Sequence, residues 1–307
     1  MSALPYRGRF APSPTGPLHF GSLVTAVASY LDARAAGGEW LIRIEDLDPP
    51  RVVPGSADAI LRTLEAFGFE WDGSILYQSD RTEAYEAALA RLIEQGVAYP
   101  CSCTRTEIQA AQQHRANADE LFYPGWCRSG PRNPDRALAF RVRVPAAPIH
   151  FHDLLQGPIE VDLAKSTGDF VIRRRDGYFA YQLAVVVDDA AQNITHVVRG
   201  ADLLASTPRQ LLLQNYLGLS HPTYAHVPLV TDENRIKLSK SAGAGALDLR
   251  DPSLELWRAL RFLRQSPPFE LRLSGVSTLW DWAIRNWQPQ LLCGIRGAVI
   301  ERSWSSH

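Results

Sequence analysis

The sequence predicts an α/β fold built on a parallel sheet, and both the order of its segments and its composition support this prediction. Residues 6–45 carry the patterns of a strand, a loop, a helix and a second strand, and residues 195–217 those of a strand followed by a helix. Of the 307 residues, 46% are hydrophobic and 21% are charged, which is typical of a globular protein of one or two domains. Such a chain can bury a sizeable core.

The first predicted unit consists of a strand, a helix and a second strand. The strand covers residues 6–10 and leads into the proline-rich loop APSPTGPLHFGS, residues 11–22. Apolar and small residues then recur with the helical period of about 3.6 residues, until Gly37 and Gly38 end the helix. The short apolar run EWLIRIED contains β-branched residues and is typical of a buried parallel strand.

The same patterns place the remaining elements. Predicted helices begin near residues 56, 82 and 206, and predicted strands cover about 137–144, 169–187 and 195–200. Ser56 and Ser206 are expected to cap their helices, and the turn residues Asp176 and Gly177 are expected to break the longest strand into a hairpin. The C-terminal segment, rich in Trp and Leu, is predicted to be helical.

Composition excludes several classes of protein. No apolar run reaches the ~18 residues of a membrane-spanning helix, and the N-terminus MSALPYRGRF lacks the apolar segment of a secretion signal. We therefore expect a cytoplasmic protein without a membrane partner. The formal net charge of −1 excludes a simple polycation that coats nucleic acid, so any contact with nucleic acid would come from a local patch.

Three of the four cysteines cluster in one short region, which indicates metal binding rather than disulfide formation. Cys101, Cys103 and Cys127 supply three thiolates, whereas zinc prefers four ligands in a tetrahedron. The fourth ligand could be His114 or the phenolate of Tyr123. Buried reduced cysteines without a metal are the alternative interpretation.

Lysine is rare in this chain. The sequence has 32 Lys and Arg residues, of which only Lys165, Lys237 and Lys240 are lysine, and two of these lie in the pentapeptide KLSKS. A site that needs a compact, flexible point charge would keep lysine even in a chain that otherwise uses arginine. Because glycine and small residues follow, a mobile loop that folds over a triphosphate is the functional interpretation, and a solvated polar loop is the alternative.

The loop APSPTGPLHFGS has features of an anion-binding turn. It follows a predicted parallel strand and leads into a helix N-terminus, where unpaired backbone amides and the helix dipole favour a phosphate. Prolines would fix its shape, Gly21 would let a flat ring approach the backbone, and His19 could donate to a phosphate. The alternative is a rigid turn in which His19 merely caps the helix.

Together these segments resemble a known enzyme family. RFAPSPTGPLHFGS and KLSKS resemble the two nucleotide-binding signatures of class I aminoacyl-tRNA synthetases, and LIRIEDLDPPR, YQLAVVVDD and THVVRGADLL are similar to the glutamyl branch. The resemblance covers about residues 7–250. It implies a Rossmann-type class I synthetase catalytic domain with an inserted zinc-bearing subdomain and a short helical C-terminal part. Ser22 replaces the second histidine of the commonest signature, and Leu238 stands where Met is frequent.

The resemblance also implies roles for individual residues. ATP, with Mg²⁺, would be handled by His19, Gly21, Ser22, Lys237 and Lys240, among which His19 and the two lysines would be catalytic and Lys240 would stabilise the α-phosphate. L-Glutamate has two carboxylates and an ammonium group, so it needs cations and one anion. Its pocket would comprise Arg9, Phe10, Ala11, Pro12, Ser13, Glu45, Tyr181 and Arg199. One structural zinc would be held by Cys101, Cys103, Tyr123 and Cys127, since the resemblance favours Tyr123 over His114.

Only 66 residues follow KLSKS, which ends at Ser241, so no anticodon-binding domain is expected. This organisation resembles the glutamyl-Q tRNA(Asp) synthetase family, which activates glutamate without tRNA and transfers it to queuosine at the wobble position of tRNA(Asp). A truncated glutamyl-tRNA synthetase that charges a tRNA 3′ end and a non-catalytic tRNA-binding paralogue are the alternatives. We expect a monomer. Its catalytic domain would consist of residues 1–98 and 137–247, with a zinc-binding insertion at residues 99–136 and a helical C-terminal part at residues 248–307.

Overall fold

The structure is a computed structural model, and it describes residues 5–111, 121–232 and 245–299. The predicted strand–helix–strand unit is confirmed. β1 (Arg7–Phe10) pairs in parallel with β2 (Glu39–Ile44), and α1 (Phe20–Ala35) connects them. β3 (Leu76–Tyr77) extends this sheet beyond β2, again in parallel.

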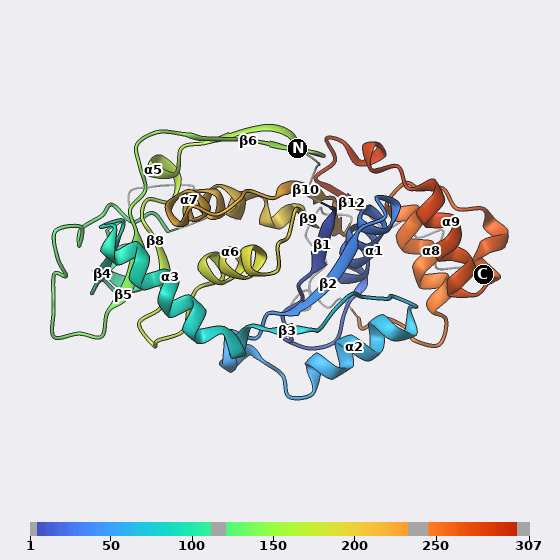
Figure 1. Ribbon diagram of the computed structural model, residues 1–307, viewed down its shortest axis with the longest axis horizontal. Coiled ribbons are helices and arrows are strands. Elements are labelled where there is room, and N and C mark those ends of the chain that lie inside the picture. The colour runs from blue at the N-terminus through green and yellow to red at the C-terminus, as the bar shows by residue number, and fades with distance from the viewer. Residues whose placement is uncertain (1–4, 112–120, 233–244, 300–307) are drawn as a thin grey trace.

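A second set of parallel strands continues the sheet on the other side of β1. β9 (His196–Gly200) pairs with β10 (Thr223–Val227), and β10 also pairs in parallel with β6 (Ile149–Asp153). β9 lies beside β1, where the Thr195 N–H donates to the Arg7 carbonyl at 2.9 Å (Figure 1). The spatial order is therefore β3-β2-β1-β9-β10-β6. The strands that follow β1 in the chain are added on one side of it, and those that follow β9 on the other, so the order of strand addition reverses between β1 and β9.

Helices cover both faces of these strands (Figure 1). α8 (Pro252–Phe262) and α9 (Val276–Asn286) pack against α1 on one face. α3 (Thr82–Glu94), α6 (Tyr181–Ala191) and α7 (Thr207–Leu217) pack together on the other face. The helical C-terminal part thus adds to the main hydrophobic core, into which α9 inserts Trp280 beside Tyr30.

The remaining elements are short. α2 (Ser56–Ala66) follows β2, and a separate antiparallel sheet has the order β4 (Ala98–Cys101), β5 (Ala139–Val142) and β8 (Phe170–Arg173). The others are α4 (Arg105–Ala110), α5 (Leu163–Ser166), β7 (Gly157–Val161), β11 (Leu229–Thr231), β12 (Gly297–Val299) and the 3₁₀ turns Pro49–Arg51, Gln78–Arg81, Ala201–Ser206, Phe269–Leu273 and Pro289–Leu292.

The strand predicted over residues 169–187 is wrong in its second half. β8 ends at Arg173, and after the expected turn the chain enters α6 at Tyr181. The central residues of α6, including Val185 and Val186, are buried, because the helix packs against α3 and α7. A short helix that is apolar on most sides shows no clear alternation of hydrophobic and polar residues with the helical period. Its β-branched residues also resemble those of a buried strand.

In the described residues, no helix combines the length and the apolar character needed to cross a membrane.

The cysteine-bearing segment connects two strands of the antiparallel sheet β4-β5-β8, called the small sheet below. β4 and β5, which lie at the two ends of the expected insertion, pair with each other. The boundaries of the insertion and of the other expected units stay a prediction.

Candidate active site

A pocket of about 890 Å³ opens at the carboxyl ends of β1 and β9, where the strand order reverses. Open parallel sheets bind ligands at this point, because the loops that leave the two strands diverge there. The structure brings together every predicted glutamate- or ATP-binding residue that it describes, and all of them line this pocket. They are Arg9, Phe10, Ala11, Pro12, Ser13, His19, Gly21, Ser22, Glu45, Tyr181 and Arg199.

His19 immediately precedes α1 and caps it. Its Nδ1 accepts a hydrogen bond from the Ser22 N–H at 3.2 Å. A Cβ on Gly21 would lie 3.1 Å from His19 Cε1, so glycine here lets the imidazole lie close to the helix backbone. The capping interpretation is therefore correct for Nδ1, and it fixes the imidazole at the wall of the pocket.

The proline-rich loop is secured by α2 and by the segment after β2. Ser56 Oγ donates to the Gly16 carbonyl at 2.9 Å and accepts from the Gly16 N–H at 3.0 Å. The Glu45 N–H donates to the Pro12 carbonyl at 3.0 Å. The expected capping role of Ser56 is wrong, since Gly55 occupies the N-cap position without a side-chain cap. Ser56 instead holds the loop.

Arg9 and Arg43 share one buried carboxylate beneath the pocket. Asp189 Oδ1 accepts from Arg43 Nη2 at 2.7 Å and from Arg9 Nε at 3.1 Å. Burial raises the pKa of Asp189, but the two guanidinium groups outweigh burial and hold it below its usual value. Asp189 thus stays ionised and fixes Arg9 at the pocket wall.

Glu45 is buried beside these arginines without a hydrogen bond to its Oε1. That oxygen lies 3.6 Å from Arg43 Nε, and neither atom has a hydrogen-bond partner in the described part of the chain. Burial raises the pKa of Glu45 to about 7, although Arg43 and Arg9 lower it. A buried carboxylate oxygen without a hydrogen bond is costly, so the site favours a ligand that brings a cationic donor.

Arg199 and Tyr181 form the opposite wall. Arg199 Nη1 donates to Tyr181 Oη at 3.2 Å, and Arg199 Nη2 donates to Thr207 Oγ1 at 2.9 Å. Burial raises the pKa of Tyr181, so the phenol keeps its proton. Because its oxygen accepts from Arg199, its hydrogen can be donated to a ligand oxygen in the pocket.

Lys237 and Lys240 lie outside the described residues. The described residues just after them return to the pocket, since the Leu247 N–H donates to the Leu18 carbonyl at 3.1 Å and Ala246 bridges to His19. Before them, β11 brings Val230 to the pocket wall. Lys165, in contrast, is an exposed residue paired with Asp162 Oδ2 at 2.7 Å.

Three cysteine thiols converge in a small core of their own. The Sγ atoms of Cys101, Cys103 and Cys127 lie within 4.8 Å of one another. Tyr123 Oη lies 3.3 Å from Cys101 Sγ and 3.7 Å from Cys103 Sγ. Ligands at about 2.3 Å from a tetrahedral zinc ion are roughly 3.8 Å apart, so these four atoms have suitable spacing. His114 lies outside the described residues.

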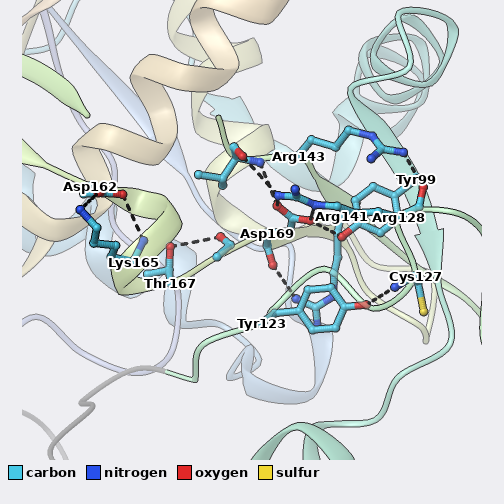
Figure 2. A network of polar contacts seen from close by, with 12 residues as sticks. Tyr99, Tyr123, Cys127, Arg128, Arg141, Arg143, Asp162, Lys165, Thr167 and Asp169 are labelled. Atoms are coloured by element: carbon cyan, nitrogen blue, oxygen red, sulfur yellow. Dashed lines mark hydrogen bonds and ion pairs between the residues drawn. The ribbon is translucent and has the colours of Figure 1, made fainter. Parts of the chain in front are cut away.

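A polar network lies behind the cysteines (Figure 2). Asp169 accepts from Tyr99 Oη, from Arg128 Nη2 at 2.6 Å and from the Val144 N–H at 2.9 Å. Arg141 Nε donates to Cys101 Sγ at 3.3 Å. The Arg141 guanidinium also lies over the Tyr123 ring, 3.9 Å from its centroid. This network therefore joins the cysteine cluster to the small sheet.

Asp189 and Arg43, which contact Arg9 and Glu45, were not predicted from the sequence as site residues. The segment YQLAVVVDD ends in two acidic residues after an apolar run, and this was a usable signal. Asp188 is also buried, and it accepts from Tyr85 Oη at 2.6 Å. Adjacent buried carboxylates at the end of an apolar helix require cationic or donor partners, which only the fold identifies.

Comparisons with known proteins agree with this arrangement. The model of the family "tRNA synthetases class I (E and Q), catalytic domain" matches residues 6–252. A protein of Dechloromonas aromatica named glutamyl-Q tRNA(Asp) synthetase is 58% identical over 92% of this chain and 94% of its own length. One of the same name from Geobacter sulfurreducens is 57% identical over 94% of both chains. The chain belongs to the glutamyl-Q tRNA(Asp) synthetase family.

Solved structures extend this comparison. A glutamate tRNA ligase from Elizabethkingia meningosepticum, in complex with its amino acid, superimposes with a TM-score of 0.83 at 26% identity. The match covers 98% of this chain and 68% of the ligase. Class I synthetases use ATP and Mg²⁺, and the pocket of this chain lies at the N-terminus of the helix that follows the first strand.

Proposed function

We propose that this chain activates L-glutamate with ATP in the absence of tRNA and then transfers the glutamyl group to the queuosine base at the wobble position of tRNA(Asp). One observation carries the first step. Glu45, whose Oε1 has no hydrogen-bond partner among the described residues, lines the same pocket as two buried arginines, Arg9 and Arg199. A ligand that satisfies all three groups has one ammonium and two carboxylates. The names of the family relatives support the second step.

Each pocket residue has a role in this proposal. The α-ammonium of glutamate pairs with Glu45, and the carboxylates take donors from Arg9 and Arg199. No described residue accepts from Nη1 or Nη2 of Arg9, so these groups are available to the substrate. Tyr181 donates its hydroxyl hydrogen to a carboxylate oxygen. Ala11, Pro12 and Ser13, with Phe10, form the wall that excludes water from the reacting carboxylate.

The nucleotide occupies the side of the pocket formed by His19, Gly21 and Ser22. His19, Lys237 and Lys240 then stabilise the negative charge that develops on the phosphates, with Lys240 at the α-phosphate. Bound Mg²⁺ would neutralise part of the phosphate charge. Because the chemistry consists of positioning and charge stabilisation, the chain needs no covalent intermediate of its own.

The two steps balance as follows. An oxygen of the glutamate α-carboxylate attacks the α-phosphorus of ATP in line, the bond to the β-phosphate oxygen breaks, and pyrophosphate leaves. A hydroxyl oxygen of the queuosine base then attacks the carbonyl carbon of glutamyl-adenylate. The bond to the phosphate oxygen breaks, AMP leaves, and the hydroxyl loses its proton.

One structural zinc ion belongs to the proposal, in an inserted subdomain. Cys101, Cys103, Cys127 and Tyr123 fit a tetrahedral site in donor type and spacing. Hydrogen bonding from Tyr123 and from backbone amides outweighs burial and lowers the pKa of Cys127 to about 6. Burial raises the pKa of Cys103 to about 12, so the metal ion itself would have to displace the thiol proton of Cys103. Metal analysis should find about one zinc per chain. Cys103→Ser should lose it, whereas substitution of the exposed Cys293 should not. Zinc below about half an equivalent in folded, unchelated protein would contradict this site.

Glutamate-dependent exchange of pyrophosphate into ATP, measured without tRNA, tests the first step. The second step is tested by transfer of labelled glutamate to tRNA(Asp) with and without queuosine, and to tRNA(Asp) that lacks its 3′-terminal adenosine. We expect exchange without tRNA, transfer that requires queuosine, and no effect of removing the 3′ adenosine. Size-exclusion chromatography of the same samples is expected to show a monomer.

Each contrary outcome points to a specific alternative. Absence of exchange would overturn the enzymatic proposal and leave a tRNA-binding paralogue. Transfer that depends on the 3′ adenosine and not on queuosine would identify a truncated glutamyl-tRNA synthetase. Exchange with transfer to neither site would overturn the second step alone.

A further inference from the structure

Two fully buried titratable residues next to the pocket have no part in the proposed mechanism. Asp153 is the last residue of β6, and His226 lies on the neighbouring strand β10. Both side chains are 0% exposed, and His226 Nδ1 lies 2.5 Å from Asp153 Oδ2. A buried polar pair is costly unless all its groups are satisfied, so each remaining hydrogen bond of the pair is informative.

Their hydrogen bonds define the protonation state of His226. Asp153 Oδ1 accepts from the backbone N–H groups of Leu155 and Gln156, at 3.0 and 2.9 Å, and these bonds together with His226 hold the pKa of Asp153 below its usual value despite burial. Burial lowers the pKa of His226. Asp153 is therefore ionised, and the neutral imidazole of His226 carries its hydrogen on Nδ1.

The other imidazole nitrogen contacts the substrate arginine. With its hydrogen on Nδ1, His226 exposes a lone pair on Nε2, which accepts from Arg199 Nε at 3.0 Å. The register of the parallel strands makes this contact, because His226 on β10 is the partner of Arg199 on β9. Asp153, His226 and Arg199 thus form a chain of hydrogen bonds that ends at the pocket.

Arg199 is held firmly but has no ion-pair partner among the described residues. Its Nε donates to His226, one Nη1 hydrogen to Tyr181, and Nη2 to Thr207 and to the Leu203 carbonyl at 3.4 Å. One Nη1 hydrogen of the five N–H donors therefore stays available. Arg9 differs, since it directly contacts the carboxylate of Asp189. The closest anion that the hydrogen bonds connect to Arg199 is Asp153, and the neutral imidazole separates the two.

We propose that Asp153 and His226 are positioning residues, which aim Arg199 at a carboxylate of the amino-acid substrate while keeping its positive charge from direct neutralisation. The imidazole supplies an acceptor for Nε without supplying a negative charge. A carboxylate at the same place would orient Arg199 equally well but would compete with the substrate. This inference rests on the proposed function, in which Arg199 binds a substrate carboxylate.

His226→Leu and His226→Gln test the orienting part. Leucine removes the acceptor for Arg199 Nε, whereas the side-chain oxygen of glutamine can replace Nε2. In glutamate-dependent pyrophosphate exchange, we expect His226→Leu to raise the KM for glutamate about tenfold or more, with the KM for ATP within about twofold. His226→Gln should restore most of the loss. Tyr224→Phe, on the same strand as His226, is the matched control, because it removes the acceptor of a buried hydrogen bond from Gln214 on α7 and keeps the ring.

His226→Glu tests the charge. The new carboxylate can accept from Arg199 Nε, so orientation is preserved while the guanidinium gains a direct counter-ion. We expect a KM for glutamate at least as high as that of His226→Leu, although His226→Gln, of the same length and shape, is close to wild type. Thermal unfolding of all four variants identifies any that fail to fold, and the Gln/Glu comparison is restricted to folded protein.

Three outcomes would overturn the inference. The KM for glutamate could rise equally in His226→Leu and His226→Gln, the KM for ATP could rise in parallel, or His226→Glu could match His226→Gln. Wild-type protein without glutamate-dependent exchange would instead overturn the proposed function, and the inference with it. The two failures are thereby distinguished by the wild-type assay.

Discussion

Two clusters of arginine around a buried carboxylate in this protein differ in how completely their polar atoms are paired. Around Asp189, beneath the pocket, Glu45 Oε1 and Arg43 Nε have no hydrogen-bond partner in the described residues. Around Asp169, behind the cysteines, both carboxylate oxygens accept hydrogen bonds and Arg128 is bound through two nitrogens (Figure 2). A complete network stabilises the fold, whereas an incomplete one beside a cavity marks the position of a ligand group.

The Asp169 cluster should produce the largest change in stability. Asp169→Ala removes the partner of Arg128, Tyr99 and the Val144 N–H, and we expect it to lower the free energy of unfolding by about 3–5 kcal/mol. Denaturant unfolding measures this loss. Asp162→Asn, at a partly buried residue in the same view that caps α5, is the control, and it should change the unfolding midpoint little because asparagine also caps helices. In folded Asp169→Ala, the KM for glutamate should stay at its wild-type value. A large rise in that KM would remove the distinction between the clusters.

Glu45 should show the opposite behaviour. Glu45→Gln removes the anion for the substrate ammonium, and we expect it to lower kcat/KM for glutamate in pyrophosphate exchange about a hundredfold. Since burial disfavours the charged form of Glu45 and its Oε1 has no hydrogen bond in the described residues, the variant should unfold at the same temperature as wild type or higher. Glu39→Gln, at the exposed start of β2, the strand that Glu45 follows, is the control for charge removal. A marked loss of stability in Glu45→Gln would show that Glu45 belongs to the structural network.

The pH dependence of glutamate binding should distinguish the clusters further. Because burial raises the pKa of Glu45 to about 7, its carboxylate becomes protonated as the pH falls below 7. Glutamate affinity measured by calorimetry should then fall about thirtyfold between pH 8 and pH 5.5, and this dependence should be absent in Glu45→Gln.

The stability contribution of Glu45 has the opposite sign. A carboxyl whose pKa is higher in the folded state contributes stability that is fully present below the unfolded value of 4.5 and is lost as the pH rises through 7. Wild type should therefore lose stability relative to Glu45→Gln between pH 4.5 and 7, over the same range in which it gains affinity for glutamate. A parallel change of stability and affinity with pH would contradict the assignment of Glu45 as the titrating group.

Local sequence patterns predicted the elements of the pocket that come from the single segment 6–45. Turn residues, a helix start and an apolar run lie together in residues 6–45, so β1, the loop, α1 and β2 could be placed correctly. Glu45 and Arg9 were proposed as substrate residues because the motifs around them resemble those of the glutamyl branch of class I aminoacyl-tRNA synthetases. Their location in the pocket agrees with this proposal, and their roles stay a prediction.

Contacts between distant segments could not be predicted in the same way. Asp189 reaches Arg9 only because residues 181–191 form a helix, where the sequence pattern favoured a strand. His226 meets Arg199 through the register of β9 and β10, which depends on packing rather than on any local pattern. The partners of Arg9 and Arg199 therefore required the structure, whereas the described pocket-lining residues that we assign to the substrates were named from sequence.

Arg141 should show the smallest effect, at the boundary between the complete network and the cysteine cluster. Its guanidinium is a cation beside three thiols and a phenol, which as zinc ligands would carry more negative charge than one Zn²⁺ neutralises. We expect Arg141→Gln to weaken zinc binding about tenfold in competition with a chelator. Arg136→Gln, which removes an exposed cation paired with Glu107, should not change zinc affinity. Unchanged affinity in Arg141→Gln would show that this arginine serves the sheet alone, and the complete network would then end at Asp169 rather than extend to the metal site.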